Sequence, residues 1–179
     1  MELLAEVFTP AMIAAPVEDI DLTTWLFTLR NDEYRSCSRA HIAGATSLAP
    51  DGKRMSINVE MPGPDLLVEN YIESISERGR CLVHSISDVL TASGKWTTID
   101  VVWEISVKRG GSATEFTNHV RVGSTDAYIR YLHEAGLDDL EVVKRETTRI
   151  LDAHSREETP LFAKNIEKKA IERIWSGNR

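Results

Sequence analysis

The fold class of this chain is decided by the stretch Ile99-Asp100-Val101-Val102-Trp103-Glu104-Ile105-Ser106-Val107-Lys108. Its odd-numbered positions are all apolar, whereas its even-numbered positions are polar or charged except for Val102. Because successive side chains of a strand point to opposite faces, this alternation predicts a β-strand with one buried face and one mostly hydrated face.

Similar short runs surround this strand on both sides, from Arg39 to Val122. Turn-forming clusters separate them at intervals typical of an antiparallel meander. These clusters are Pro50-Asp51-Gly52, Pro62-Gly63-Pro64-Asp65, Glu77-Arg78-Gly79, Ala92-Ser93-Gly94 and Arg109-Gly110-Gly111. We therefore expect about six antiparallel strands in this part of the chain.

The N-terminal segment predicts one strand followed by two short helices. An extended run covers Glu6 to Ala14, and Pro16 ends it because proline has no ladder donor. Asp19-Ile20-Asp21 can cap a first helix, in which Leu22, Trp25, Leu26 and Leu29 recur at helical spacing. Asn31-Asp32 is expected to cap a second helix before Tyr34.

The C-terminal segment predicts two further helices. Ser124-Thr125-Asp126 can cap the first, Gly136 interrupts it, and the second runs from about Asp138 toward Trp175. An inner stripe at helical spacing passes through Leu140, Val143, Thr147, Ile150, His154, Glu158 and Leu161. Pro160 lies within this helix, where we expect a kink or a break.

The composition indicates one ordinary globular domain, residues 1–179. The formal net charge of -7 disfavours nucleic acid, because binding to its phosphates depends on Lys and Arg. No apolar run approaches the roughly 20 residues that span a bilayer, which disfavours a membrane partner. Glu2 and Glu6 stand where a signal peptide carries positive charge. We expect a cytoplasmic protein.

The order of these elements resembles one architecture, the helix-grip fold of the START, Bet v1 and polyketide-cyclase (SRPBCC) superfamily. The segment Ala14-Ala15-Pro16-Val17, which leads into the first helices, is a local feature that also resembles this superfamily. The resemblance implies an α+β fold in which a curved antiparallel sheet of about seven strands wraps around a long C-terminal helix. It also implies a cavity for a small molecule between sheet and helix, and it leaves the activity open.

The leading functional hypothesis is a protein that binds a small apolar or aromatic metabolite in that cavity, with or without cyclase-like or hydrolase-like chemistry. Aromatic side chains expected to line the pocket are Trp25, Tyr34, Trp103, Phe116, Tyr128 and Tyr131. In a catalytic version, His84 or His41 would be the acid–base group and Tyr71 would polarise a carbonyl.

An alternative hypothesis is a zinc-dependent enzyme. Trp25-Leu26-Phe27-Thr28-Leu29, Glu33-Tyr34-Arg35, His41, His154 and Glu158 resemble zinc-dependent phloroglucinol (diacetylphloroglucinol) hydrolases, which cleave a carbon–carbon bond of an acylated phenol. That resemblance implies zinc ligands at His41, at Glu69 or Glu73 (Glu73 in the preferred set), and at His154 with Glu158, and a substrate-contacting Tyr34. The chain is shorter than those hydrolases and has Cys37-Ser38 where they have an aromatic residue and a histidine.

Other interpretations of these residues stay open at this point. His154 and Glu158 are also what a charged amphipathic helix presents at its polar face. A third class is an interaction module without catalysis, similar to the co-chaperone members of the superfamily. A homodimer through sheet edges or helix ends is compatible with such a fold, although no residue specifies one.

Overall fold

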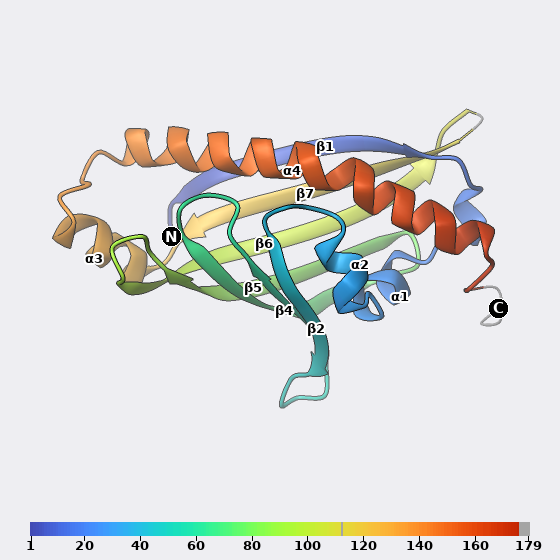
Figure 1. Ribbon diagram of the computed structural model, residues 1–179, viewed down its shortest axis with the longest axis horizontal. Coiled ribbons are helices and arrows are strands. Elements are labelled where there is room, and N and C mark those ends of the chain that lie inside the picture. Colours follow the sequence, from blue (N-terminus) through green and yellow to red (C-terminus); the bar gives the residue numbers. More distant parts are fainter. Residues whose placement is uncertain (112, 176–179) are drawn as a thin grey trace.

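The computed structural model describes residues 1–111 and 113–175. In these residues seven antiparallel strands form one sheet in the order β1-β7-β6-β5-β4-β3-β2 (Figure 1). The strands are β1 (Leu3–Ile13), β2 (His41–Leu48), β3 (Arg54–Glu60), β4 (Leu66–Ser76), β5 (Arg80–Leu90), β6 (Trp96–Arg109) and β7 (Thr114–Ser124). The five predicted turns connect consecutive strands from β2 to β7. The last strand, β7, pairs with the first, β1.

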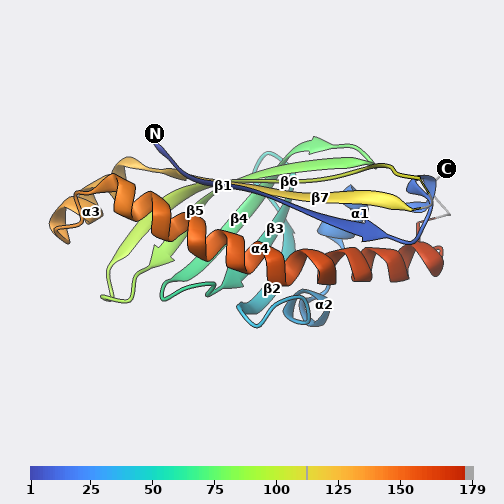
Figure 2. The same ribbon diagram turned by 90° about the horizontal axis from the view of Figure 1, so that it is seen from above.

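The helices occupy one side of this sheet. They are the 3-10 turn η1 (Val17–Asp19), α1 (Leu22–Phe27), α2 (Asn31–Arg35), α3 (Asp126–Glu134) and α4 (Leu140–Ile171). The sheet curves around α4, and α1 and α2 lie beside the C-terminal half of that helix (Figures 1 and 2). The helix-grip α+β fold expected from the sequence is confirmed. No helix among the described residues is long and apolar enough to cross a bilayer.

The short helices begin at side-chain caps. Asp21 Oδ1 accepts the Thr24 backbone N–H at 2.9 Å, as predicted for the first helix. The prediction that Asn31-Asp32 caps the second helix was wrong. That cap comes from Glu33, whose Oε2 accepts the Arg30 N–H at 3.0 Å, while Asn31 Oδ1 accepts the Gly44 N–H of β2 at 3.0 Å.

Helix α4 is one unbroken helix of 32 residues, so of the expected kink or break at Pro160 the break does not occur. Pro160 lies on the exposed face, where water can bond the carbonyl that its missing N–H leaves free. The expected inner stripe holds as far as Glu158, but Leu161 is 38% exposed and Phe162, at 1%, takes its place. The reason is that a spacing of four residues from Glu158 keeps Phe162 on the inner face.

The inner face of the sheet is apolar in its centre and polar on β3. Trp103, Ile105 and Val101 of the deciding strand are buried as predicted. On β3 the buried residues are Ser56, Asn58 and Glu60, whereas Met55, Ile57 and Val59 are only partly buried. The polar side chains of β3 therefore face the helix instead of solvent, and they form one wall of a polar site.

Candidate functional site

A cavity of about 340 Å³ lies between the inner face of the sheet and α4. Most of its lining is apolar, from aliphatic side chains of β4 to β7 and from Trp103, Tyr128, Tyr131 and Phe162. At one end the lining is polar and buried: Asn58, Glu60, Glu69, Tyr71, His154 and Glu158. The cavity reaches the surface elsewhere, where its lining residues Leu137 and Val142 are about half exposed, at 48% and 47%.

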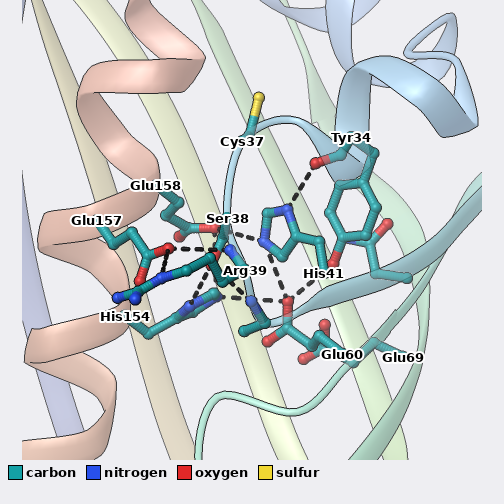
Figure 3. A network of polar contacts seen from close by, with 12 residues as sticks. Tyr34, Cys37, Ser38, Arg39, His41, Glu60, Glu69, His154, Glu157 and Glu158 are labelled. Atoms are coloured by element: carbon teal, nitrogen blue, oxygen red, sulfur yellow. Dashed lines mark hydrogen bonds and ion pairs between the residues drawn. The ribbon is translucent and has the colours of Figure 1, made fainter.

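Four buried side chains from three elements meet at the polar end: His41 of β2, Glu60 of β3, and His154 and Glu158 of α4 (Figure 3). His41 Nε2 lies 3.2 Å from Glu158 Oε2 and 3.5 Å from Glu60 Oε2. His154 Nε2 lies 3.4 Å from each of the same two oxygens. Two imidazole nitrogens and two carboxylate oxygens thus enclose one small space.

The four N···O separations are compatible with a metal ion of the size of zinc, and one ligand atom each of His41, Glu60 and His154 lies within 4.8 Å of the others. Zinc binds imidazole nitrogen and carboxylate oxygen at about 2.0–2.2 Å, usually with four ligands in a tetrahedron. The edge of such a tetrahedron is about 3.4 Å. The four N···O separations are 3.2, 3.5, 3.4 and 3.4 Å, so each already has the length of a ligand–ligand edge.

The orientation of His41 leaves its Nε2 free to act as a ligand. Its Nδ1 lies 2.7 Å from the Tyr34 backbone carbonyl, which can only accept, so Nδ1 carries the hydrogen. The imidazole also stacks on the Tyr34 ring, with centroids 3.9 Å apart and planes 6° apart. A carbonyl that fixes the far nitrogen of a histidine in this way is the usual outer-shell arrangement at metal sites.

Glu158 is held by Asn118 of β7. The Trp103 Nε1–H donates to Asn118 Oδ1 at 2.7 Å, which fixes the orientation of the amide because an indole N–H can only donate. The Asn118 Nδ2 group therefore donates to Glu158 Oε1 at 3.0 Å and to Thr159 Oγ1 at 2.9 Å. The other carboxylate oxygen of Glu158, Oε2, is the one that faces both imidazoles.

The electrostatics of the polar end reflect three buried carboxyl groups near two imidazoles. Burial raises the pKa of Glu69 well above its ordinary value, and the neighbouring Glu60 raises it further. Burial also opposes ionisation of Glu60, but His154 and His41 bring the pKa of Glu60 below its ordinary value. Burial likewise opposes protonation of His154, yet Glu158 and Glu60 raise the pKa of His154 to about 10.

Glu69 and Tyr71 form a second polar pair on the inner face of β4. The Tyr71 hydroxyl donates to Glu69 Oε1 at 2.8 Å, and both residues are 4% exposed. Burial and the adjacent Glu69 raise the pKa of Tyr71 well above its ordinary value, so its hydroxyl keeps its proton. Both side chains line the cavity next to the four clustered residues.

The structure does not bring every candidate residue to this site. Glu73, expected in the metal set, instead forms an ion pair with Arg54 at 2.7 Å. The register of β3 against β4 sets Met55 opposite Ile72, so the strand end at Arg54 lies beside Glu73, about 13 Å along β4 from Glu69. His84 lies on the outer face of the sheet, 2.7 Å from Asp100 and with 44% of its side chain exposed.

The predicted pocket aromatics divide into three groups. Trp103, Tyr128 and Tyr131 line the cavity. Trp25 and Phe116 are fully buried in the core, where the Trp25 Nε1–H donates to Asn165 Oδ1 at 2.8 Å. Tyr34 lies behind the cluster and donates its hydroxyl to Glu60 Oε2 at 2.8 Å. Tyr34 therefore orients Glu60, a candidate metal ligand, without lining the cavity itself.

Sequence reasoning missed Glu60, although a signal was present. In Arg54-Met55-Ser56-Ile57-Asn58-Val59-Glu60 polar and apolar residues alternate, and such a strand is ordinarily expected to bury its apolar side. Because this strand buries its polar side, the Glu60 side chain points into the site. The register of β2 against β3 pairs Glu60 with His41, so these two candidate ligands lie next to each other.

Comparisons with known proteins support the fold. No family model and no curated protein matches the sequence. Among solved structures, the chain is similar to the aromatase/cyclase Zhui from Streptomyces sp. R1128, with a TM-score of 0.60, 10% identity, and 97% of each chain covered. It is also similar to the di-domain ARO/CYC StfQ from the steffimycin biosynthetic pathway, with a TM-score of 0.60 and 11% identity.

The second similarity is partial in length. The match covers 93% of this chain and 51% of StfQ, so the chain spans about half the length of that di-domain protein. At these identities the likeness shows the helix-grip fold that polyketide aromatase/cyclases share, as the sequence resemblance implied. The activity has to be argued from the site itself.

Proposed function

We propose that this protein is a zinc-dependent hydrolase that binds a small, largely apolar carbonyl compound, such as an acylated phenol, in the cavity between sheet and α4. The observation that carries the proposal is the set of four N···O separations of 3.2–3.5 Å among His41, Glu60, His154 and Glu158. The aromatase/cyclase neighbours support a cavity that accepts aromatic molecules.

Zinc, when bound, would supply a Lewis acid for the carbonyl and for water. The described residues would do the rest. His41, Glu60, His154 and Glu158 would hold the ion, and the last three of these also line the cavity, so the ion would face the ligand. The apolar remainder of the lining would exclude bulk water and hold the apolar body of the substrate.

Glu69 and Tyr71 would act on the substrate from β4, next to the four clustered residues. The Tyr71 hydroxyl keeps its proton because burial and Glu69 raise its pKa. It would donate this hydrogen to a carbonyl oxygen of the substrate in exchange for its present hydrogen bond to Glu69 Oε1. Glu69, whose pKa is raised chiefly by burial, can hold or release a proton next to the leaving group. Under this proposal the proton source and the metal ion would act at the same end of the cavity.

The proposal is tested by elemental analysis of purified protein after dialysis against a weak chelator. About one zinc per chain is expected, and His154→Ala should lose it because the variant removes a ligand on α4. His133→Ala is the matched control, since His133 lies on α3 with its side chain 81% exposed and bonds Asp138 instead. Protein that hydrolyses its substrate fully without any metal would contradict the proposal.

A second candidate is metal-free acid–base catalysis of the cyclase type, with the same pocket. The specific observation for it is the Glu69–Tyr71 pair in the cavity wall, which needs no metal to hold or donate a proton. The two candidates separate cleanly in one experiment. Exhaustive chelation should abolish turnover in the first and leave it unchanged in the second.

A further inference from the structure

The cavity lining carries an unusual distribution of charge. Five carboxyl groups line it, those of Glu60, Asp65, Glu69, Glu146 and Glu158. Among the described residues that line the cavity there is neither a lysine nor an arginine, and the one basic side chain is His154. His154 is already engaged, because its Nε2 lies 3.4 Å from both Glu60 and Glu158.

The deep end of the cavity offers no counter-charge to an anionic ligand. A divalent cation held by the four clustered residues would balance Glu60 and Glu158 and leave Glu69 beyond them. Glu69 is 4% exposed and takes its hydrogen bond from the uncharged Tyr71 hydroxyl. Ionised, Glu69 repels an anion, and protonated, it carries no positive charge that would balance one.

The surface end of the cavity offers none either. Asp65 Oδ1 accepts the Ala92 backbone N–H at 2.8 Å, and within residues 1–111 and 113–175 no lysine or arginine forms an ion pair with it. Glu146 does have a cation, but Arg149 approaches it from outside at 2.6 Å and is itself 68% exposed. An anion entering here would pass two carboxylates and leave water without gaining a cationic partner.

We propose that the cavity takes its ligand as an uncharged molecule and rejects carboxylates and phosphate esters of the same shape. The inference rests on the proposed function only in treating this cavity as the substrate site. Its physical reason is that an anion loses its hydration in an apolar cavity and is repelled by the carboxylates that line it. A neutral phenol or ketone loses much less hydration.

A matched set of naphthalenes tests this selection by isothermal titration calorimetry on the protein as purified. The probes are 1-naphthol, 1-naphthoate and 1-naphthyl phosphate, which share one ring system and differ in the charge of the substituent. We expect 1-naphthol to bind at least about 30-fold more tightly than either anion at pH 7. If 1-naphthol binds no more tightly than 1-naphthoate, because both bind or because neither does, the inference is overturned.

Two neighbouring threonines of α4 provide a charge-introducing pair. Thr147 lines the cavity, whereas Thr148 is exposed outside it. Thr147→Lys should lower the preference for 1-naphthol over 1-naphthoate about tenfold, and Thr148→Lys should leave it unchanged. Equal effects of both variants would overturn the inference, because the selection would then arise from net charge and not from the cavity.

The zinc content of the same samples separates this inference from the proposed function. A metal-free protein that still prefers 1-naphthol retains the inference and contradicts the hydrolase. A protein with one zinc per chain that binds 1-naphthoate as tightly as 1-naphthol retains the metal site and overturns the inference.

Discussion

Glu60 Oε2 and His154 Nε2 lie 3.4 Å apart, although the two residues belong to a strand and a helix on opposite walls of the cavity. The contact exists because β3 buries its polar face and α4 crosses that face. Both partners are nearly inaccessible, with side chains 10% and 7% exposed. Burying two ionisable groups costs more free energy than burying an apolar pair of similar size, so this contact is not explained by stability alone.

Glu60→Gln is predicted to weaken zinc binding by more than the roughly 10–100-fold that outer-shell changes cost, because it removes a charged ligand. Glu73→Gln, the same change on the next strand, should leave zinc binding intact, since Glu73 pairs with Arg54. Zinc affinity measured by competition with a chromogenic chelator distinguishes the two variants. Equal losses in both would mean that Glu60 is not a ligand.

The contrast between these two glutamates shows what the sequence could predict. The strands show a period of two residues, and the short helices and the pair one turn apart on α4 show a spacing of three to four. These are local patterns that a single sequence displays. Which strand brings the third and fourth ligands depends on register and on which face is buried. On β3 the ordinary assumption about the apolar face fails, so Glu60 was missed.

The same limit explains why the sequence could not predict on which face of β5 His84 lies. On β5 both faces carry apolar residues, with Leu82 and Ile86 on one side and Val83 and Val89 on the other. Alternation therefore could not decide which face is inner. The structure buries Val83 and Val89 and turns His84 outward. Tyr71, expected to polarise a carbonyl, is buried beside Glu69 in the cavity lining.

Asn118→Asp is predicted to weaken zinc binding about 10–100-fold while the fold is retained. The new carboxylate can still accept from Trp103 but cannot donate to Glu158, so it repels the residue that Asn118 holds. Asn165→Asp is the matched control, because Asn165 accepts from Trp25 in the same way. A zinc affinity that is equally reduced in both variants would assign Asn118 a purely structural role.

Tyr71→Phe is predicted to lower kcat for an acylated phenol at least about tenfold, because it removes the hydroxyl donor that faces the cavity. His84→Ala should leave kcat unchanged and alter stability by less than about 1 kcal/mol, since its contact with Asp100 is a surface pair. Initial rates of carboxylic acid release measure both effects. A large loss of kcat in His84→Ala would contradict the assignment of the cavity as the active site.

Glu33→Gln is predicted to destabilise the protein by about 2–3 kcal/mol at pH 7, because it leaves the Lys169 ammonium buried without its partner at 3.0 Å. Burial opposes ionisation of Glu33, but the Arg30 N–H and Lys169 lower its pKa below the ordinary 4.5. A carboxyl group with a lowered folded-state pKa contributes stability above pH 4.5 that is lost as the pH falls through the folded-state value.

The difference in unfolding free energy between wild type and Glu33→Gln should therefore shrink between pH 5 and pH 3, as measured by urea denaturation. Asp32→Asn is the control on the same helix, since Asp32 pairs with Arg30 at the surface with its side chain 70% exposed. A difference that stays constant over this pH range would show that the Glu33 charge is not the source of the stabilisation.

Gly63→Ala is predicted to reduce the affinity for 1-naphthol several-fold with less than about 1 kcal/mol change in stability. An added methyl group at Gly63 would lie 2.9 Å from Ile150 Cδ1, the flexible end of a side chain that lines the cavity. The side chain can move away only by occupying cavity space. Gly111→Ala adds the same methyl group where it meets nothing within 4 Å, and it should leave binding unchanged.

Ile150→Val removes Cδ1 and should restore the affinity of Gly63→Ala, so the two changes should be strongly non-additive in a double-mutant cycle. Such coupling would mean that the β3–β4 turn sets the width of the cavity through its contact with α4. Additive effects would instead mean that Gly63 acts on the backbone of the turn, and that the space around Ile150 does not limit the ligand.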